Sequence, residues 1–84
     1  MSATKIEYEG IVAKLFYDDV NDPSRPGWYA EYFDEDGLIG DSEKTWHEEM
    51  PTRRNASTKA ETIVRRELRR LAKERADRAH RAAR

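Results

Sequence analysis

The sequence predicts an α+β protein in which a three-stranded antiparallel sheet packs on one long C-terminal helix. Three observations favour this fold class. Apolar residues alternate with polar ones in the first half of the chain, which is typical of strands. After residue 58 they recur at three- and four-residue spacing, which is typical of an amphipathic helix. Segments rich in Pro, Gly and acidic residues separate the predicted strands. The 84 residues are expected to form a single domain, 1–84.

Residues 5–17 are predicted to form the first strand. Ile6 and Tyr8 alternate with charged residues, and the phase of the alternation shifts by one after Gly10. A glycine at a change of phase suggests a β-bulge. Residues 18–27 hold two prolines and end in glycine, which predicts a long loop.

Two further strands are predicted, over 28–33 and 38–47. The first of them is rich in aromatic residues, which favour strands. The acidic segment 34–37 between them ends in glycine and is a hairpin-turn signal. The last strand has a weaker pattern, ends near Trp46 and is followed by Pro51, which has no backbone N–H to donate to a sheet.

Residues 58–80 are predicted to form one helix. Thr58 and Glu61 match a capping box, in which a hydroxyl and a carboxylate satisfy free backbone N–H groups at a helix start. The stripe expected to face the core consists of Ala60, Ile63, Val64, Leu68 and Leu71. Residues 59–80 of this helix alone span about 33 Å, whereas a typical strand spans roughly 17–20 Å. The last turns are therefore expected to extend past the sheet, where they either fray or pack on a partner.

Charge is divided between the two halves of the chain. Residues 1–50 hold four basic and thirteen acidic residues, a net charge of −9, and residues 51–84 hold twelve basic and four acidic ones, a net charge of +8. The whole chain has a net charge of only −1. Such asymmetry favours contact with nucleic acid or with a charged partner. The two halves also neutralise each other in part within one fold.

The sheet is predicted to have one face under the helix and one open face. If Trp28, Ala30 and Tyr32 point towards the helix, the residues between them point away from it. The open face is then expected to carry Val12, Lys14, Phe16, Tyr29, Glu31 and Phe33. Exposed apolar patches tend to be binding sites, unless the 18–27 loop covers them. We expect a protein-binding surface formed by Tyr29, Glu31, Phe33, Asp34 and Asp36.

A second candidate surface is the basic face of the predicted helix. Arginine suits phosphate because its planar guanidinium binds two oxygens at once, and eleven of the sixteen Lys and Arg residues are arginine. Glutamates interrupt the run and can form ion pairs along the helix. The residues expected to bind nucleic acid under this alternative are Arg53, Arg54, Arg65, Arg66, Arg69, Arg70 and Lys73.

The sequence carries no constellation that indicates an enzyme. It has no cysteine, no Gly-rich phosphate loop and no Ser-centred nucleophile motif. His47 and His80 are the only histidines, whereas a metal site needs three or four converging ligands. Asp34 and Glu43 fit a calcium loop, but Tyr32 stands at its first position and the flanks resemble strands rather than helices. We expect no cofactor, no metal and no small-molecule substrate.

The chain lacks signals for membrane insertion and secretion. No run of about 18 apolar residues exists, so no segment is expected to span a membrane. Met1 is followed by polar residues, which argues against a signal peptide. The absence of cysteine fits a reducing compartment, and a cytoplasmic location is expected.

A loose pattern runs from Trp28 to Leu71. It consists of Trp28, Ala30 and Tyr32, the turn at 34–37, Trp46 near a strand end, and Thr58-Lys59-Ala60-Glu61 at the helix start. In this pattern the chain resembles the N-terminal module of phage-type integrases, which has three strands and one helix and binds arm-type DNA sites. The resemblance implies that fold and DNA contact through the sheet. Acidic residues on the corresponding strands repel phosphate, so the DNA-contacting residues are not carried over.

In its brevity and its Arg- and Ala-rich style, the chain also resembles small open reading frames of high-GC bacteriophages or their hosts, which implies a phage-encoded protein. We expect a small non-catalytic regulatory or adaptor protein that binds another protein, or a second copy of itself, through its acidic sheet face or the end of its helix. One variant is DNA mimicry, in which carboxylates of the first half imitate a row of phosphates. The alternative is a nucleic-acid-binding module that uses the Arg-rich helix face.

Overall fold

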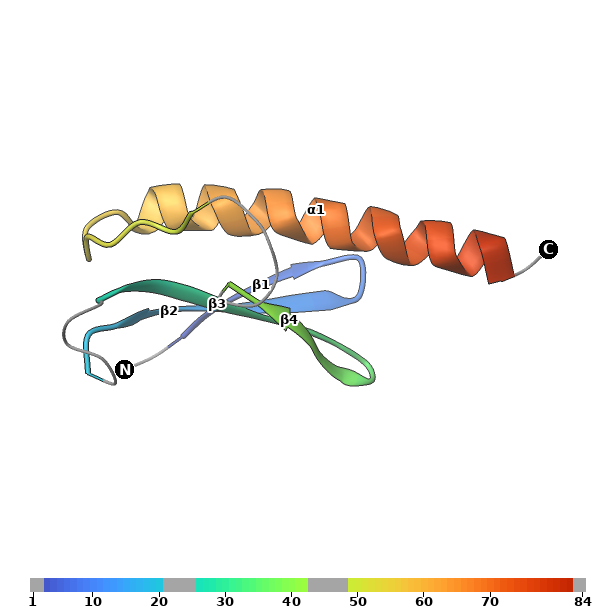
Figure 1. Cartoon of the computed structure of the whole chain (residues 1–84), viewed down its shortest axis with the longest axis horizontal. Coiled ribbons are helices and arrows are strands. Elements are labelled where there is room, and N and C mark those ends of the chain that lie inside the picture. Colours follow the sequence, from blue (N-terminus) through green and yellow to red (C-terminus); the bar gives the residue numbers. More distant parts are fainter. Residues whose placement is uncertain (1–2, 21–25, 43–48, 83–84) are drawn as a thin grey trace.

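The computed structural model describes residues 3–20, 26–42 and 49–82. The elements in chain order are β1 (Thr4–Tyr8), β2 (Ile11–Asp18), β3 (Gly27–Asp34), β4 (Gly37–Asp41) and α1 (Ser57–Ala82). The strands form one antiparallel sheet in the order β1-β2-β3-β4. The helix lies on one face of this sheet (Figure 1). The predicted α+β fold with an antiparallel sheet and one C-terminal helix is confirmed, but the sheet has four strands instead of three.

The additional strand arises because the predicted first strand is a hairpin. Glu9 and Gly10 have φ angles of 48° and 83°, and a type I′ hairpin turn requires positive φ at both central residues. Tyr8 pairs with Ile11 across this turn. The expected bulge at Gly10 is therefore wrong. The alternation shifts because a two-residue turn takes the chain into the next strand and keeps Ile6 and Ile11 on the same, buried face.

The predicted turn between the next two strands is confirmed, but the strand after it is shorter than expected. The carboxylate of Asp34 accepts a hydrogen bond from the backbone N–H of Asp36 at 2.8 Å, and this contact fixes the turn locally. β4 ends at Asp41, before the predicted end near Trp46. Residues 43–48, and Trp46 with them, lie outside the described residues.

The helix begins slightly earlier than predicted. The N–H of Ala60 donates to the carbonyl of Ala56 at 3.1 Å, and the N–H of Ala56 donates to the carbonyl of Arg53 at 3.0 Å. Thr58 therefore lies within the first turn and does not occupy the cap position predicted for it. Its carbonyl accepts a hydrogen bond from the Thr62 hydroxyl at 3.0 Å.

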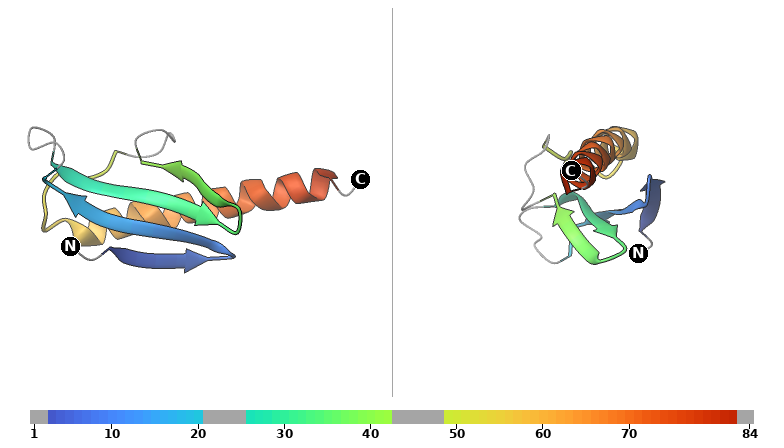
Figure 2. Two further views of the ribbon diagram at one scale, coloured as in Figure 1. Left: turned by 90° about the horizontal axis from the view of Figure 1, so that it is seen from below. Right: turned by 90° about the vertical axis from the view of Figure 1, so that its right-hand side faces the viewer.

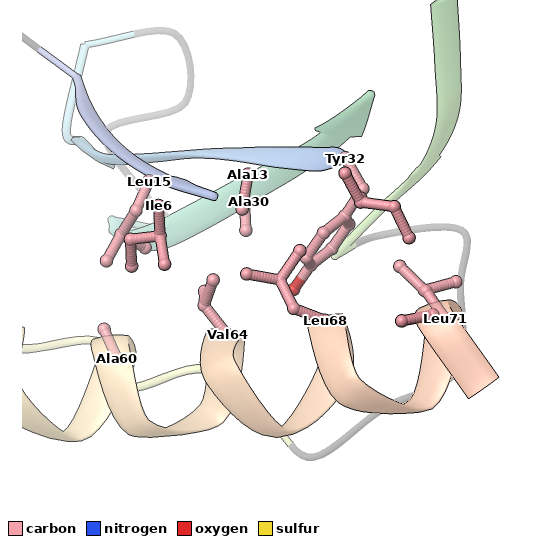
Figure 3. Packing of buried hydrophobic residues seen from close by; sticks show 11 residues of the cluster. Ile6, Ala13, Leu15, Ala30, Tyr32, Ala60, Val64, Leu68 and Leu71 are labelled. Carbon is pink, nitrogen blue, oxygen red and sulfur yellow. The ribbon is translucent and has the colours of Figure 1, made fainter. Parts of the chain in front are cut away.

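The hydrophobic core lies between α1 and the covered face of the sheet. The buried cluster takes residues from β1, β2 and β3 and from α1 between Ala60 and Ala72. Figure 3 shows Leu15, Ala30 and Tyr32 of the sheet pointing towards Val64 and Leu68 of the helix. All five residues of the predicted helix stripe are at most 7% exposed, so this prediction is confirmed. Burial of these side chains is the main force that holds the helix on the sheet.

The helix is longer than the sheet that it covers. Its 26 residues span about 39 Å, and the molecule measures 49 × 21 × 21 Å. Every side chain described after Arg75 is exposed, and the ribbon runs past the end of the sheet (Figure 2). The predicted overhang of the last helical turns is confirmed.

Candidate functional site

The first candidate site is the face of the sheet that α1 does not cover. The strand register and the alternation of side chains assign to it Lys5, Glu7, Val12, Lys14, Phe16, Tyr29, Glu31, Phe33, Leu38 and Asp41. We term this set the open face. It includes all six side chains that the sequence predicted for it, and the buried residues of β2 and β3 alternate with them.

Three aromatic rings stand on the two central strands of the open face. Phe16 and Tyr29 are cross-strand partners, and their stacked rings have centroids 6.1 Å apart. The Lys14 ammonium lies over the Phe33 ring, 4.8 Å from its centroid. Val12 stands opposite Phe33. Neighbours within the sheet position these rings, so they need no second layer to order them.

Charges on the open face are divided between its two sides. One cross-strand row runs from Lys5 through Lys14 and Glu31 to Asp41. The β1–β2 side of this row is basic and the β3–β4 side is acidic. The β3–β4 side of the open face is therefore acidic, whereas the β1–β2 side carries two lysines and the single carboxylate of Glu7. Because lysines interrupt the carboxylates, the open face does not favour the DNA-mimicry variant.

The acidic turn between β3 and β4 contributes to the fold itself. Asp34 uses its carboxylate to hold the turn, and the neighbouring Glu35 forms an ion pair with Arg75 of α1. Asp36 is exposed. Of the residues predicted to bind protein, the structure therefore places Tyr29, Glu31 and Phe33 on the open face, and Asp34 and Asp36 at its end.

The helical and sheet layers carry opposite charges, and two ion pairs between residues that the structure describes join their ends. The Arg54 guanidinium, just before α1, donates to the Asp19 carboxylate at 2.7 Å and lies over the Tyr17 ring, 4.6 Å from its centroid. Near the other end of the molecule, Arg75 binds Glu35. Both pairs are largely exposed, so each contributes at most about 1 kcal/mol. These contacts orient the two layers rather than hold them together.

The basic residues predicted to bind nucleic acid fall into two groups. Arg54 and Arg70 are engaged within the chain, since Arg70 forms ion pairs with Glu67 and with Glu74. The hydrogen bond to Glu67 raises the pKa of Arg70. The charges of both arginines are thus balanced by neighbouring carboxylates, which makes them weaker candidates for phosphate contact than the sequence indicated.

The second group remains available on the outer side of α1. Arg65, Arg69 and Lys73 are exposed, and no ion pair joins them to another described residue. Their four-residue spacing aligns them on one side of the helix. We term these three residues the basic ridge. Arg53 and Arg66 are exposed but lie outside the ridge. Arg66 has an interaction within the protein, and the carbonyl of Arg53 accepts a hydrogen bond from the Trp28 indole N–H at 2.9 Å.

A buried polar cluster between helix and sheet was not predicted from the sequence. Glu67 is only 4% exposed, and the Arg70 Nε donates to it at 2.8 Å. Burial, and then the nearby charge of Glu67, raise the pKa of Tyr32 above its usual range. The available signal was spacing: Glu67 lies three residues after Val64 and four before Leu71, within the apolar stripe. The hydrogen bonds between Arg70 and Glu67 lie within α1, and Tyr32 is the member of the cluster that comes from the sheet.

Two further kinds of site are absent from the part of the chain that the structure describes. No group of three or more His, Asp or Glu side chains that could hold a metal ion occurs among the described residues. His80 is exposed on the helix overhang, and His47 lies outside the described residues. No helix in this part of the chain is both long and apolar enough to cross a membrane.

Comparisons of the chain with protein-family models, curated proteins and solved structures found no match. The resemblance to the phage integrase module stays a prediction. We infer the function from the two candidate surfaces, the open face and the basic ridge, which lie on opposite sides of the molecule.

Proposed function

We propose that the chain is a small non-catalytic adaptor or regulatory protein that binds another protein through its open face. One observation carries this proposal: α1 covers one face of the sheet (Figure 1), and the strand register places Phe16, Tyr29 and Phe33 on the other. Apolar groups that stay in contact with water favour association with a partner that removes that contact.

The composition of the open face indicates the kind of partner. Aromatic residues are enriched at the centres of protein interfaces, and polar residues form the rim. Leu38 is 54% exposed and extends the apolar centre onto β4. Glu31 and Asp41 stand on the same side. A protein surface with an apolar centre and basic groups opposite β3 and β4 is complementary to this arrangement.

The proposal is tested by capture with two matched variants. Bait proteins are the wild type, the open-face variant Tyr29→Ser/Phe33→Ser and the ridge variant Arg65→Glu/Arg69→Glu, each checked for folding by circular dichroism. We expect the wild type and the ridge variant to retain the same partner from a lysate of the native source. The open-face variant should retain at least about tenfold less, because truncated aromatic anchors dominate interface energetics. Equal retention by the open-face variant would contradict the proposal.

Nucleic-acid binding by the basic ridge is a second candidate function. The observation that favours it is that Arg65, Arg69 and Lys73 are exposed and unpaired with any described residue. Because the ridge and the open face lie on opposite sides, one molecule could use both surfaces at once. A phosphate backbone is the ligand that such a row of cations suits.

Fluorescence anisotropy with duplex DNA at several salt concentrations tests this second function. Three phosphate contacts predict that log affinity falls with log salt at a slope of about −3. The ridge variant Arg65→Glu/Arg69→Glu should lose binding. Lys5→Glu/Lys14→Glu makes the same change in net charge on the opposite face and should retain most of it. Absence of wild-type binding at low salt eliminates this candidate.

A further inference from the structure

β1 is an edge strand whose outer side is open. In the sheet it neighbours only β2, and no other described element lies along its free edge (Figure 2). Tyr8 and Ile11 flank a two-residue turn, and residues in this position form a hydrogen-bonded pair. Because such pairs alternate along a strand, the backbone groups of Lys5 and Glu7 point outwards. An edge of this kind is a template for pairing with another strand.

Two side chains of β1 have unfavourable surroundings in the single chain. Lys5 stands directly opposite Lys14 on the open face, and like charges in this position repel each other. Tyr8 is 39% exposed, and Ile6 is the one buried residue of the strand. A strand that brought an anion beside Lys5 and covered Tyr8 would relieve both conditions.

We propose that two copies of this chain pair antiparallel through β1 and join their four-stranded sheets into one. In a pairing centred on Ile6, Lys5 of each copy stands opposite Glu7 of the other, and two-fold symmetry makes this contact twice. Ile6 then stands opposite Ile6, and Tyr8 opposite Thr4. The backbone groups that pair are the outward-pointing ones of Lys5 and Glu7.

Charge selects this register over its neighbours. A shift by two residues in one direction places Lys5 opposite Lys5, and a shift in the other direction places Glu7 opposite Glu7. A shift by one residue turns the two covered faces to opposite sides of the joined sheet. In parallel, in-register pairing, like charges again lie side by side. The strand is thus complementary to itself in one antiparallel arrangement.

The other exposed edge and the helix overhang are less complementary to a second copy than β1 is. On the opposite edge, β4 contains two glycines, Gly37 and Gly40, and pairing centred on Ile39 gives no opposite charges. The helix overhang carries Arg78 and Arg81 with Asp77 as its only acidic residue, so two overhangs repel each other. Pairing through β1 engages Lys5 and Glu7 at the edge of the open face but leaves the aromatic side chains of β2 and β3 uncovered, and it is therefore independent of the function proposed above.

Sedimentation velocity of the full chain, measured from micromolar to millimolar concentrations, tests the pairing. We expect the wild type to show a reversible monomer–dimer equilibrium. Lys5→Glu and Glu7→Lys each replace both opposite-charge contacts by like-charge contacts. Each variant alone should dimerise at least about tenfold more weakly than the wild type.

An equimolar mixture of the two variants restores the contacts. The Lys5→Glu chain carries acidic side chains at both positions and the Glu7→Lys chain carries basic ones, so the two chains are complementary to each other. A heterodimer should therefore form at the same protein concentrations at which the wild type dimerises. Tyr29→Ser/Phe33→Ser leaves β1 unchanged and should dimerise like the wild type, so failure of one proposal does not imply failure of the other. A wild type that stays monomeric, a single variant that dimerises normally, or a mixture that stays monomeric would overturn the inference.

Discussion

The two faces of the sheet belong to the same strands and carry different kinds of residue. On the covered side, the core residues of β2 and β3 are Ile11, Ala13, Leu15, Ala30 and Tyr32, none of them more than 1% exposed. On the other side, the same strands present aromatic and charged side chains that remain partly exposed. The covered face is completed by α1, whereas the open face is ordered by contacts within the sheet. It follows that the fold can be stable without a second layer on the open face, which leaves that face available for a partner.

The largest expected contrast between the two faces is in how much free energy of unfolding is lost when a side chain is truncated to alanine. Leu68 is 1% exposed against the covered face, and Leu68→Ala should lower the free energy of unfolding by about 3 kcal/mol. Phe33→Ala should cost about 1 kcal/mol, because Phe33 loses only cross-strand contacts with Val12, Lys14 and Leu38. Urea denaturation measures both values. Equal losses would show that the two faces contribute alike to stability.

The next effect concerns the charge inside the covered layer. Arg70→Met removes the ion pair of the buried Glu67 and should cost about 2 kcal/mol. This is less than the roughly 3–5 kcal/mol for a fully buried pair, because Arg70 is 41% exposed. Arg69→Met, on the outer side of the same helix, should change stability by no more than about 0.5 kcal/mol. If urea denaturation gives the two variants equal stability, Glu67 does not depend on Arg70.

Alkaline pH should lower the free energy of unfolding because Tyr32 is buried on the covered face of the sheet. Burial and the charge of Glu67 raise the pKa of this tyrosine, so the unfolded chain loses the proton near pH 10 while the folded chain retains it. The contribution of Tyr32 to the free energy of unfolding is fully present below about pH 10. Above that pH it falls by up to about 1.4 kcal/mol per pH unit. Unfolding measured across this range should depend less steeply on pH in Tyr32→Phe than in the wild type. Identical slopes for the wild type and for Tyr32→Phe would contradict this role of Tyr32.

The smallest expected effect is a gain in stability at the turn that joins β1 to β2. Glu9 has a φ angle of 48°, and asparagine adopts such an angle at lower cost than glutamate. Glu9→Asn should therefore stabilise the protein by about 0.5 kcal/mol without changing either face of the sheet. Thermal denaturation measures the gain. Glu7→Asn makes the same substitution within β1 and should bring none, and a loss of stability in Glu9→Asn would argue against the turn type.

Much of the fold follows from two sequence periods. The alternation in β2 and β3 maps directly onto two faces of a sheet, and the stripe from Ala60 to Leu71 maps onto one face of a helix. The hairpin at Glu9 could not be predicted in the same way. Glutamate is no turn signal, and a glycine at a change of phase fits a bulge as well as a turn.

The positions of the candidate surfaces could be predicted from the sequence. Which of their charged side chains form ion pairs within the chain could not. Arg54 is engaged by Asp19, which lies 35 residues away in the sequence, so spacing could not indicate the contact. Glu67 and Arg70 are three residues apart, and that pair was within reach of helix periodicity. The basic side of the open face was missed because Lys5 comes from the strand that the predicted fold did not separate from β2.

NMR spectra recorded with a soluble gadolinium chelate test directly whether one face of the sheet is covered and the other open. The chelate enhances the relaxation of protons that solvent can reach. We expect strong enhancement for the methyl protons of Val12 and the ring protons of Phe16 and Phe33, and little for the methyl protons of Ile11 and Leu15. Protection of the Phe16 and Phe33 rings equal to that of Leu15 would show that the open face is covered, and the proposed binding surface would then not exist.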